Sequence, residues 1–543
     1  MIKLQDALRH AAERPDHIAL VDGGRRITWS ELADEIAKVA GGLAGTLPAG
    51  RPARAAFLCC NGWELVIVTA AFETLGVPVT GLDFEESAEA TADALDQLAP
   101  TVVVSSRLHR PLLIDTGWHD REGVLQVHLH GVGEELAAPE PIVKDPQAGE
   151  PVAYSTLAAA QSSVTTPLTQ PFESFAVSYG ADGAARLVVR HKSSEARRQA
   201  ELVDEFGLDE HDTYLATVPM HHASSPGWAR IFLSLGGTLV LGPYHDLDEL
   251  ARLIVEESVT ATLMVAPVLS RLLASPASAE LYATSSLRLV LTGGQHLNRW
   301  IVNEAWDRLG PVLHHYYGST ETGLVTVLGP DELQISPCRS GRAMPGVTIA
   351  VLDPEDRPLP PGLRGRVAVA GPHVMDAYGD GPAPTTVVDL GDGLGRRTFL
   401  PTGDTGVIDY EGRLELTGRT AGVPVAGPAD ERELGILRLE AELLHQPGVR
   451  DVAVLRTALP DRGEVLAVPF VPVAADLEAT AHRALTATCA RRAPGLPVHV
   501  VAVTAIPYSP TGKIRTRELL AEALPLINLH LHLDEQSVRE ISA

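Results

Sequence analysis

The sequence predicts an α/β protein with a large layered body, a β-rich part after it and a small α+β domain near the end. Short β-type runs alternate with helical periodicity up to about residue 335, which is typical of a mostly parallel sheet covered by helices. Beyond that point strands follow one another through tight turns, which indicates antiparallel pairing. A Gly/Pro-rich stretch at 421–430 then separates the final part. A chain of 543 residues is too long for one compact core.

Within the body, a helix is predicted to begin with Ser30 as its N-cap, because apolar residues follow in helical register as far as Leu43. Residues 134–151 are rich in Pro, Glu and Ala and are predicted to form a surface connector. Two β-type runs, 55–60 and 101–106, lie on either side of a helical stretch from Leu65 to Thr74. Further β-type runs follow at 238–242, 260–266 and 287–294.

The second half divides into antiparallel strands and a smaller mixed unit. Strands are predicted at 347–353, 364–371 and 405–419, and then a helix near 431–446, a strand at 452–456, a helix near 476–491 and a strand at 498–503. The predicted boundaries are 1–419 for a large N-terminal domain (α/β body to about 335, β-rich subdomain 336–419), 420–524 for a small C-terminal domain after a hinge near Ala421, and 525–543 for a tail.

The tail alternates Leu and His after Pro525. Such alternation suits a strand that covers a sheet edge or a partner subunit, or a loosely packed chain end. The oligomeric state is not predicted by any pattern in the sequence.

Composition restricts the kind of partner. Apolar residues make up 45% and charged residues 21%, which excludes wholesale disorder. With 44 basic and 69 acidic residues the net charge is -25, and this disfavours a nucleic-acid-coating or membrane-surface role. An anionic ligand would be held locally, by backbone amides, a metal ion or a few cations. The chain has four cysteines, and two of them are adjacent. This number and spacing predict neither a disulfide framework nor a Cys-rich zinc site.

The first twenty residues contain no apolar signal core, and no run reaches the roughly 20 apolar residues of a membrane helix. We therefore expect a cytoplasmic location.

A candidate phosphate-binding loop lies at 177–191. Gly180 and Gly183 allow the backbone to direct successive N–H groups at one anion, and Arg186 adds a positive charge. No Gly-Lys-Ser/Thr follows, so the segment is not a Walker loop. By itself, an isolated Gly-x-x-Gly is more typical of a surface turn between two strands.

Three further segments have the residue types of a nucleotide site. The stretch YYGSTETGL (316–324) combines an aromatic ring, hydroxyls and the carboxylate of Glu321, which suit a base, phosphates and Mg²⁺. Asp404 could accept from two ribose hydroxyls, with Arg419 nearby, and Lys513 lies on a Pro/Gly loop from which a cation could reach an active site. Each also has an ordinary structural role: a turn former, a strand end and a surface lysine.

The order and spacing of these segments resemble the adenylate-forming enzyme superfamily, which comprises acyl-CoA synthetases, adenylation domains of nonribosomal peptide synthetases and luciferases. The most specific marks are YGSTETG, a TGD followed by GR, and PTGK near the end. The resemblance extends over nearly the whole chain and includes VPMHHASSPGW (218–228) and TGGQHL (292–297).

The resemblance implies a large domain of two α/β subdomains and a β-rich one, and a small domain that rotates between half-reactions. ATP and an acid would give an acyl-adenylate and pyrophosphate, with Mg²⁺, and a nucleophile such as CoA would then accept the acyl group. Loss of the bridging lysine, Lys513, would lower the adenylation rate on the order of 10²–10³-fold, because a cation that stabilises transition-state charge is removed.

The resemblance also assigns roles residue by residue. Catalytic roles fall to Lys513, Thr320, Glu321 (the Mg²⁺ ligand) and His222. The acid pocket would comprise His222, Gly293, Tyr317, Gly318 and Thr322, although a partly buried structural histidine is an alternative for His222. The nucleotide site would contain Tyr317 stacked on adenine, Asp404 on the ribose, and Ser178, Gly180, Gly183, Arg186, Gly293, Gly294, Gln295, Gly318, Ser319, Thr320, Arg419 and Lys513.

The chain departs from the family pattern in two places. Ala181 and Asp182 replace hydroxyl residues of the phosphate loop, so we expect weaker ATP binding. At the hinge, Ala421 replaces the usual Asp or Lys, and Pro428 removes an amide donor from the stretch that would line a pantetheine tunnel. The motifs for adenylation are therefore retained, whereas the segment that would contact the acceptor is changed.

Several functions remain open on the sequence. A carboxylate passed to CoA or a carrier-protein thiol is the leading prediction; a diazotising enzyme that adenylates nitrite for an arylamine and an amide-forming ligase are alternatives. A nucleotide-binding relative without turnover is a fourth. A metal protein would depend on paired histidines such as His314 with His315, but no third ligand is placed by the sequence.

Overall fold

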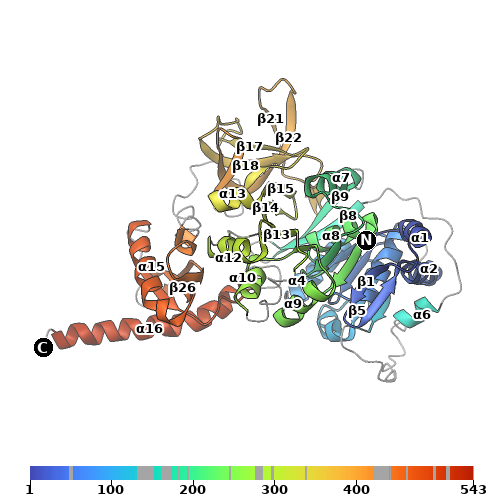
Figure 1. Cartoon of the computed structure of the whole chain (residues 1–543), viewed down its shortest axis with the longest axis horizontal. Helices are drawn as coiled ribbons and strands as arrows, with labels where there is room; N and C mark the ends of the chain where they lie inside the picture. The colour runs from blue at the N-terminus through green and yellow to red at the C-terminus, as the bar shows by residue number, and fades with distance from the viewer. Residues whose placement is uncertain are drawn as a thin grey trace.

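The computed structural model describes most of the chain as a set of layered α/β units, with the β-rich part and a C-terminal unit beside them (Figure 1). The described residues are 1–47, 53–130, 152–159, 173–179, 184–191, 195–243, 246–275, 285–294, 297, 299–336, 339–419, 439–440, 442–459, 463–492, 497–508 and 514–541. Among them no helix is long and apolar enough to cross a membrane.

The first α/β unit contains a parallel five-stranded sheet in the order β4-β3-β5-β6-β7. Its strands are short and apolar, as expected for a sheet buried on both faces. Helices lie between β3, β4, β5 and β6 along the chain, because parallel strands need a crossover connection. The bounds are β3 Ala55–Leu58, α3 Trp63–Thr74, β4 Val79–Gly81, α4 Ala88–Leu98, β5 Val102–Ser106, α5 Arg110–Asp115, β6 Leu125–Leu129, β7 Val152–Ala153 and α6 Tyr154–Ala158.

The second unit is the parallel half of a long sheet in the order β14-β13-β12-β10-β11-β1, with β2 antiparallel at its edge. This confirms the predicted parallel α/β body. The bounds are α1 Leu4–Glu13, β1 Ile18–Asp22, β2 Arg25–Thr28, α2 Trp29–Thr46, α7 Glu195–Phe206, β10 Thr213–Ala216, α8 Ser224–Leu235, β11 Thr238–Leu241, α9 Leu247–Glu256, β12 Ala261–Leu263, α10 Ala266–Ala274, β13 Leu289–Gly293, α12 Arg299–Leu309 and β14 Leu313–Ser319.

The β-rich part continues the same sheet antiparallel, from β14 through β15, β16, β23, β22 and β18 to β17. The change from parallel to antiparallel pairing therefore occurs at the β14–β15 hairpin, which contains YGSTETG. The bounds are β15 Gly323–Leu328, α13 Pro330–Ile335, β16 Gly341–Ala343, β17 Thr348–Leu352, β18 Arg364–Ala370, β21 Thr386–Asp389, β22 Arg396–Ile408 and β23 Arg413–Arg419.

A separate hairpin connects these units. Strands β8 (Glu173–Tyr179) and β9 (Ala185–His191) pair antiparallel, and β9 also pairs with β19 (Ala377–Tyr378), which is followed by β20 (Gly381–Pro382). The segment predicted to bind phosphate, 177–191, thus includes the end of β8 and all of β9, while residues 180–183 lie outside the described residues.

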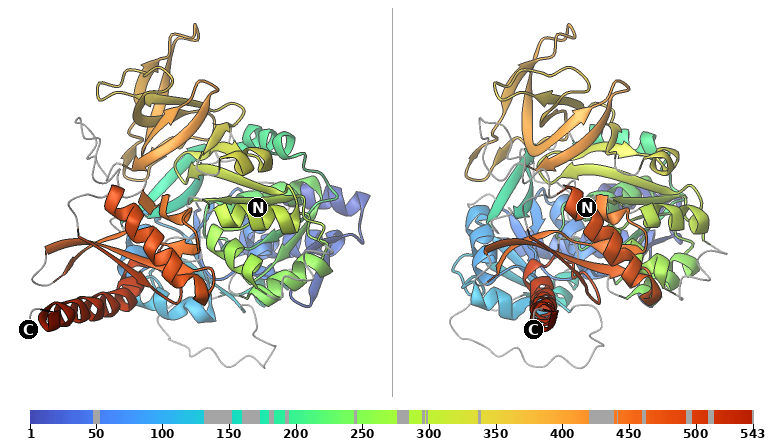
Figure 2. Two further views of the ribbon diagram at one scale, coloured as in Figure 1. Left: turned by 60° about the vertical axis from the view of Figure 1, so that its left-hand side comes forward. Right: turned by 90° about the vertical axis from the view of Figure 1, so that its left-hand side faces the viewer.

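The C-terminal unit contains the antiparallel sheet β24-β26-β25 with β27 parallel to β26 (Figure 2). The predicted strand at 452–456 is wrong in its limits, because two strands meet there and 453–454 lie between them. The bounds are β24 Val449–Val452, β25 Leu455–Leu459, β26 Gly463–Pro472, α15 Glu478–Arg492, β27 Val498–Ala502 and α16 Thr516–Ile541.

Two other predictions about elements are corrected. Thr28, and not Ser30, is the N-cap of α2: its hydroxyl accepts from the Glu31 backbone N–H, and the Glu31 carboxylate accepts from the Thr28 N–H. The tail residues to 541 continue α16, which includes Pro525, and Ile527 is fully buried in the C-terminal core. The connector at 134–151 lies outside the described residues.

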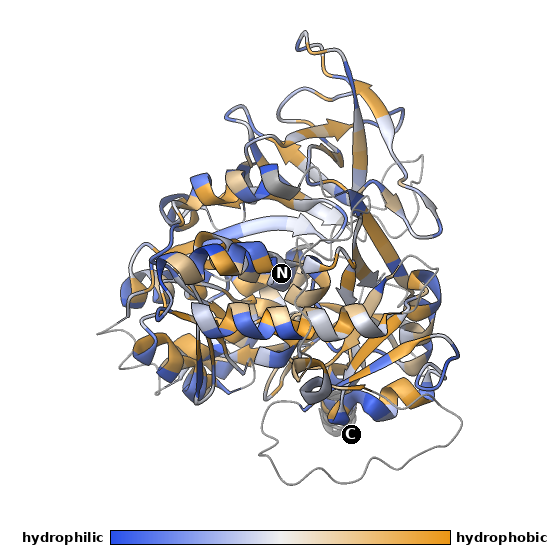
Figure 3. Cartoon of the chain, turned by 90° about the vertical axis from the view of Figure 1, so that its right-hand side faces the viewer, coloured by the Kyte–Doolittle hydropathy of each residue, from blue (hydrophilic) through white to orange (hydrophobic). Residues whose placement is uncertain are grey.

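One apolar core joins the two α/β units: it includes Phe57 of β3, Phe72 of α3 and Leu239 of β11. Figure 3 shows hydrophobic residues along the central strands and hydrophilic ones on the outer faces of the covering helices. The C-terminal unit has its own apolar clusters on the two faces of its sheet.

Candidate adenylation site

The YGSTETG hairpin forms a turn held by its own hydroxyls. The Ser319 N–H donates to Thr322 Oγ1 at 3.0 Å, and Ser319 Oγ accepts from the N–H groups of Glu321 and Thr322, each at 3.2 Å. A Cβ at Gly318 would lie 2.2 Å from the Gly323 carbonyl oxygen, so the close approach of the two strands requires glycine there. The exposed Ser319 and the partly buried Thr320 and Glu321 are therefore presented on a preformed turn.

The turn is joined to β22 through Tyr317, whose phenol donates to Asp404 Oδ2 at 2.5 Å. Asp404 lies opposite Arg419 in the β22–β23 pairing. The sheet register thus brings the TGD and GR motifs close to Tyr317, which is 87 positions from Asp404 in the sequence. The Arg419 side chain lies outside the described set.

The β8–β9 hairpin holds the same turn from the other side. The Arg190 guanidinium donates to the Thr320 carbonyl, and its Nε donates to the His373 carbonyl at 3.2 Å. The Met375 N–H donates to the Glu321 carbonyl at 2.8 Å. Arg190 lies in the segment 177–191 but is not among its predicted phosphate-binding residues, and Met375 belongs to no recognised motif, so these supports could not be predicted from the sequence.

Arg186, from the predicted phosphate loop, and Glu321 share a neighbour. Both act on Tyr378 of β19: burial and the neighbouring Glu321 carboxylate raise the pKa of Tyr378, and a hydrogen bond from Arg186 opposes that rise. Tyr378 is therefore within electrostatic reach of both a carboxylate and a guanidinium. Ser178 pairs with Arg186 across the hairpin, whereas Gly180 and Gly183 lie outside the described residues.

The acid-pocket residues lie at the ends of β13 and α8. Gly293 is opposite Tyr316 in the β13–β14 register, and Gly294 has φ +82°, a conformation that favours glycine. His222 Nδ1 is 2.8 Å from Ser224 Oγ at the start of α8. Gln295 is not among the described residues.

His221, next to His222, is the more buried of the pair. Its Nε2 lies 3.5 Å from Asp83 Oδ1, and burial lowers its pKa in spite of that carboxylate. A Cβ at Gly81 would lie 2.3 Å from the His221 Cα, so β4 passes directly beside this histidine.

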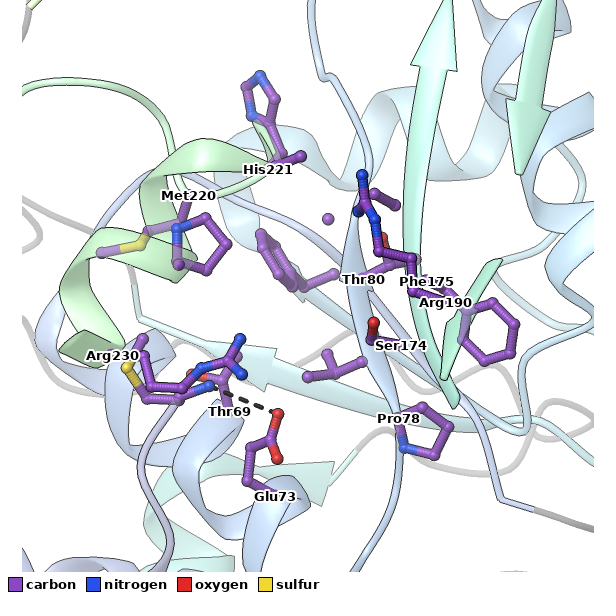
Figure 4. Close-up of a pocket in the computed structure, with 18 of the residues that line it drawn as sticks. Thr69, Glu73, Pro78, Thr80, Ser174, Phe175, Arg190, Met220, His221 and Arg230 are labelled. Carbon is purple, nitrogen blue, oxygen red and sulfur yellow. Dashed lines mark hydrogen bonds and ion pairs between the residues drawn. The ribbon is translucent and has the colours of Figure 1, made fainter. Parts of the chain in front are cut away.

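A cavity of about 100 Å³ lies between α3, β4, β8 and α8, and His221 is one of the residues that line it (Figure 4). Glu73 forms an ion pair with the amino group of Met1 at 3.5 Å, and the His221 ring points away from them. The residues that line the cavity include Arg190 and Arg230. None of the five predicted acid-pocket residues is among them, although the structure describes all five.

Lys513 and Ala421 lie outside the described residues, but the chain on either side of Lys513 is placed. Tyr508 and Ile514 form an antiparallel bridge, and the Arg515 N–H donates to the Pro507 carbonyl at 2.8 Å. The two ends of the PTGK segment are therefore adjacent. Among the described residues no group of three metal-binding side chains occurs.

Comparison with known proteins decides the family. The model of the family described as AMP-binding enzyme matches residues 8–379. The chain belongs to the AMP-binding enzyme family. It is an ATP-dependent adenylate-forming ligase, as the motifs predicted.

Named relatives of this ligase act on aromatic acids. A salicylyl-CoA synthase / salicylate adenylyltransferase from a Streptomyces species is 31% identical over 527 residues, covering 93% of this chain and 90% of the relative. The indoleacetate–CoA ligase of Aromatoleum aromaticum is 27% identical, covering 94% and 97%. The diazotising alternative receives no support from these relatives.

The amide bond synthetase McbA from Marinactinospora thermotolerans has a similar solved structure, with a TM-score of 0.73 at 22% identity. The match covers 95% of this chain and 99% of that one. This likeness confirms the predicted α/β class and the adenylate-forming fold.

Proposed function

We propose that this ligase activates a carboxylic acid as its AMP anhydride, with Mg²⁺, and transfers the acyl group to CoA or a carrier-protein thiol. The observation that supports this most directly is the junction of Tyr317 and Asp404 beside the Thr320–Glu321 turn. An adenine on Tyr317 and a ribose on Asp404 would leave the phosphates at that turn.

The residues present suit ATP and Mg²⁺. Glu321 offers carboxylate oxygens, the ligands that Mg²⁺ prefers, and a bound Mg²⁺ would neutralise phosphate charge. Arg186 supplies a cation on the hairpin side of the turn, and Thr320 a hydroxyl. The ionised Asp404 carboxylate accepts hydrogen bonds and donates none, so it can exchange the bond from Tyr317 for bonds from ribose hydroxyls.

In the first half-reaction the acid's carboxylate oxygen attacks the α-phosphorus and pyrophosphate leaves. Lys513 would stabilise the charge that develops between these groups. In the second, the acceptor sulfur attacks the acyl carbon, the bond to AMP breaks, and the thiol proton leaves. Thiol transfer is proposed because the named relatives above are CoA-linked enzymes.

The test is pyrophosphate release from ATP and Mg²⁺ with pooled carboxylic acids, each with and without CoA. We expect release with one pool, faster with CoA, and a fall on the order of 10²–10³-fold for Lys513→Ala and for Glu321→Gln. Lys38→Ala is the matched control, since Lys38 is an exposed lysine 3.0 Å from Glu35.

Three results would overturn the proposal. Release only with nitrite and an arylamine would make the chain a diazotising enzyme. ATP binding without release in any pool would make it a nucleotide-binding protein without turnover. Release that an amine accelerates and CoA does not would replace the thiol acceptor with an amide-forming step.

A further inference from the structure

A cysteine and a histidine lie side by side at the carboxyl edge of the five-stranded sheet. Cys60 comes two positions after the end of β3, and His109 follows β5, the strand that pairs with β3. Because the carboxyl ends of parallel strands meet at one edge, the loops after them bring these side chains together. Cys60 Sγ lies 3.8 Å from His109 Nε2, and His109 Nδ1 lies 2.8 Å from the hydroxyl of Ser106, the last residue of β5.

The protonation states of this pair suit a proton transfer from sulfur to nitrogen. Burial lowers the pKa of His109 to about 4, with a smaller effect from His221, so the ring is neutral near pH 7. Burial and the Glu85 carboxylate raise the pKa of the Cys60 thiol, so the sulfur keeps its proton. In the tautomer with a proton on Nδ1, the ring donates to Ser106, and Nε2 faces the thiol as an acceptor. An adjacent base of this kind makes a thiol nucleophilic by removing its proton.

The Cys60 thiol is also within reach of a reactant. The structure describes three cysteines, of which Cys59 and Cys489 are buried and Cys60 is partly exposed. The fourth, Cys338, lies outside the described residues.

The loop that contains Cys60 is bound to the segment that leads to the predicted acid pocket. The Asn61 side-chain amide donates to the Val218 carbonyl at 3.1 Å and accepts from the Met220 N–H at 2.6 Å. These two bonds fix Asn61 to the chain directly before His221 and His222.

An aromatic side chain joins the cluster to the same histidines. The Phe84 ring contacts the rings of His109 and His221, with centroids 4.4 and 4.8 Å away. Cys60, His109 and Phe84 follow β3, β5 and β4, so three neighbouring strands of the sheet contribute to this site.

The lysine segment approaches this edge from the other side. Glu85, whose carboxylate acts on the Cys60 thiol, forms an ion pair with Arg515, two positions after Lys513. Lys513 would contact the acid's oxygen during adenylation. The activated carbonyl group is therefore expected between the His222 segment and the lysine segment, both of which adjoin the loops around Cys60.

We propose that Cys60 is an acyl acceptor within the chain itself, with His109 as its general base. The inference rests on the proposed function, which supplies the acyl-adenylate. The Cys60 sulfur attacks the acyl carbon and a C–S bond forms. The bond from that carbon to the phosphate oxygen breaks, AMP leaves with the electron pair, and the thiol proton passes to His109 Nε2. The product is a thioester on Cys60, formed without any oxidant or reductant.

The experiment incubates the full chain with ATP and Mg²⁺, without CoA, and with acetate, hexanoate, benzoate, salicylate or indole-3-acetate. Pyrophosphate release, the intact mass of the protein and the position of the modified peptide are measured in the same samples. With an acid that gives release, we expect one acyl group per chain, on Cys60. Neutral hydroxylamine should remove it, because it cleaves thioesters and leaves amides intact.

Three variants test the roles of the two side chains. Cys60→Ala should abolish the thioester, and His109→Gln should slow its formation on the order of 10²-fold, because a general base contributes about 10²–10⁴-fold. Cys489→Ala is the matched control: it changes a buried cysteine of the C-terminal core and should retain the thioester on Cys60. Cys60→Ser replaces Cys60→Ala if the latter does not fold, and any ester on that serine should resist neutral hydroxylamine.

Pyrophosphate release without a thioester on Cys60 in the wild type would overturn the inference and leave the proposed function intact. So would a thioester on another residue, such as Cys338, that persists in Cys60→Ala. Formation of the Cys60 thioester at the wild-type rate in His109→Gln would overturn the role of His109 as base. Absence of release with every acid, by protein that still binds ATP, would instead overturn the proposed function.

Discussion

At the scale of single residues, Asp404 shows how a motif gains its meaning from position. In sequence it is an acidic residue after a glycine, equally suited to a turn. In the structure it lies within β22, and its carboxylate accepts from Tyr317 at 2.5 Å. A carboxylate held beside an aromatic ring is suited to a nucleoside, since one group can bind the ribose and the other the base.

Asp404→Asn is expected to raise the KM for ATP by about 10-fold or more, because hydrogen bonds to a charged acceptor contribute about 1.5–3 kcal/mol. The more specific readout uses 2′-deoxy-ATP. Wild type should discriminate against it, and Asp404→Asn should treat the two nucleotides alike. Asp392→Asn, a change at an exposed turn of the same β-rich part, should leave both KM values unchanged. Equal use of the two nucleotides by the wild type would contradict a ribose role for Asp404.

At the scale of elements, the strand and helix that flank the PTGK segment are fixed to the C-terminal core. Tyr508 donates to both oxygens of Asp451 in β24, at 2.9 and 3.1 Å, and Ile514 packs on the same core. Burial raises the pKa of Asp451 to about 6 and that of Glu440 to about 7, in each case above the unfolded value. Hydrogen bonds from Tyr508 to Asp451 and from the Val454 N–H to Glu440 oppose these rises.

Because both carboxyl groups bind protons more tightly in the folded state, their contribution to stability is complete at low pH and is lost as pH rises through about 4 to 7. The free energy of unfolding of the C-terminal unit should therefore fall over this window. Asp451→Asn should flatten the fall, as measured by denaturant unfolding at pH 5 and pH 8. Asp476→Asn, an exposed change in the same unit, should preserve it. A steeper fall in Asp451→Asn would refute the assignment.

At the scale of the whole molecule, the C-terminal unit touches the large body near its lysine segment. Arg515 forms ion pairs with Glu85, in the segment before α4, and with Glu518 at 3.2 Å. Since Arg515 is two positions from Lys513, we expect this contact between the units to affect the position of the lysine.

Glu85→Arg is expected to lower the adenylation rate about 2–5-fold at low salt, because a partly exposed ion pair contributes up to about 1 kcal/mol. The double change Glu85→Arg with Arg515→Glu should restore it. In 0.5 M salt the difference should largely disappear, because charges near the surface are screened. Glu89→Arg, in the first turn of α4, is the matched charge reversal. Loss of activity that the double change does not restore would argue against the contact.

The sequence by itself determined the α/β class, the order of the elements and the motifs of an adenylate-forming ligase, because periodicity and short motifs are local properties of a chain. It missed the N-cap of α2 by two residues, and it predicted no helix for the tail after Pro525. Only the tertiary structure decided that Arg190 supports the Thr320 turn, that Tyr317 meets Asp404, and that Tyr316 lies against Gly293. The reason is physical: these contacts join residues from different strands and helices, and which of them meet depends on sheet register and packing.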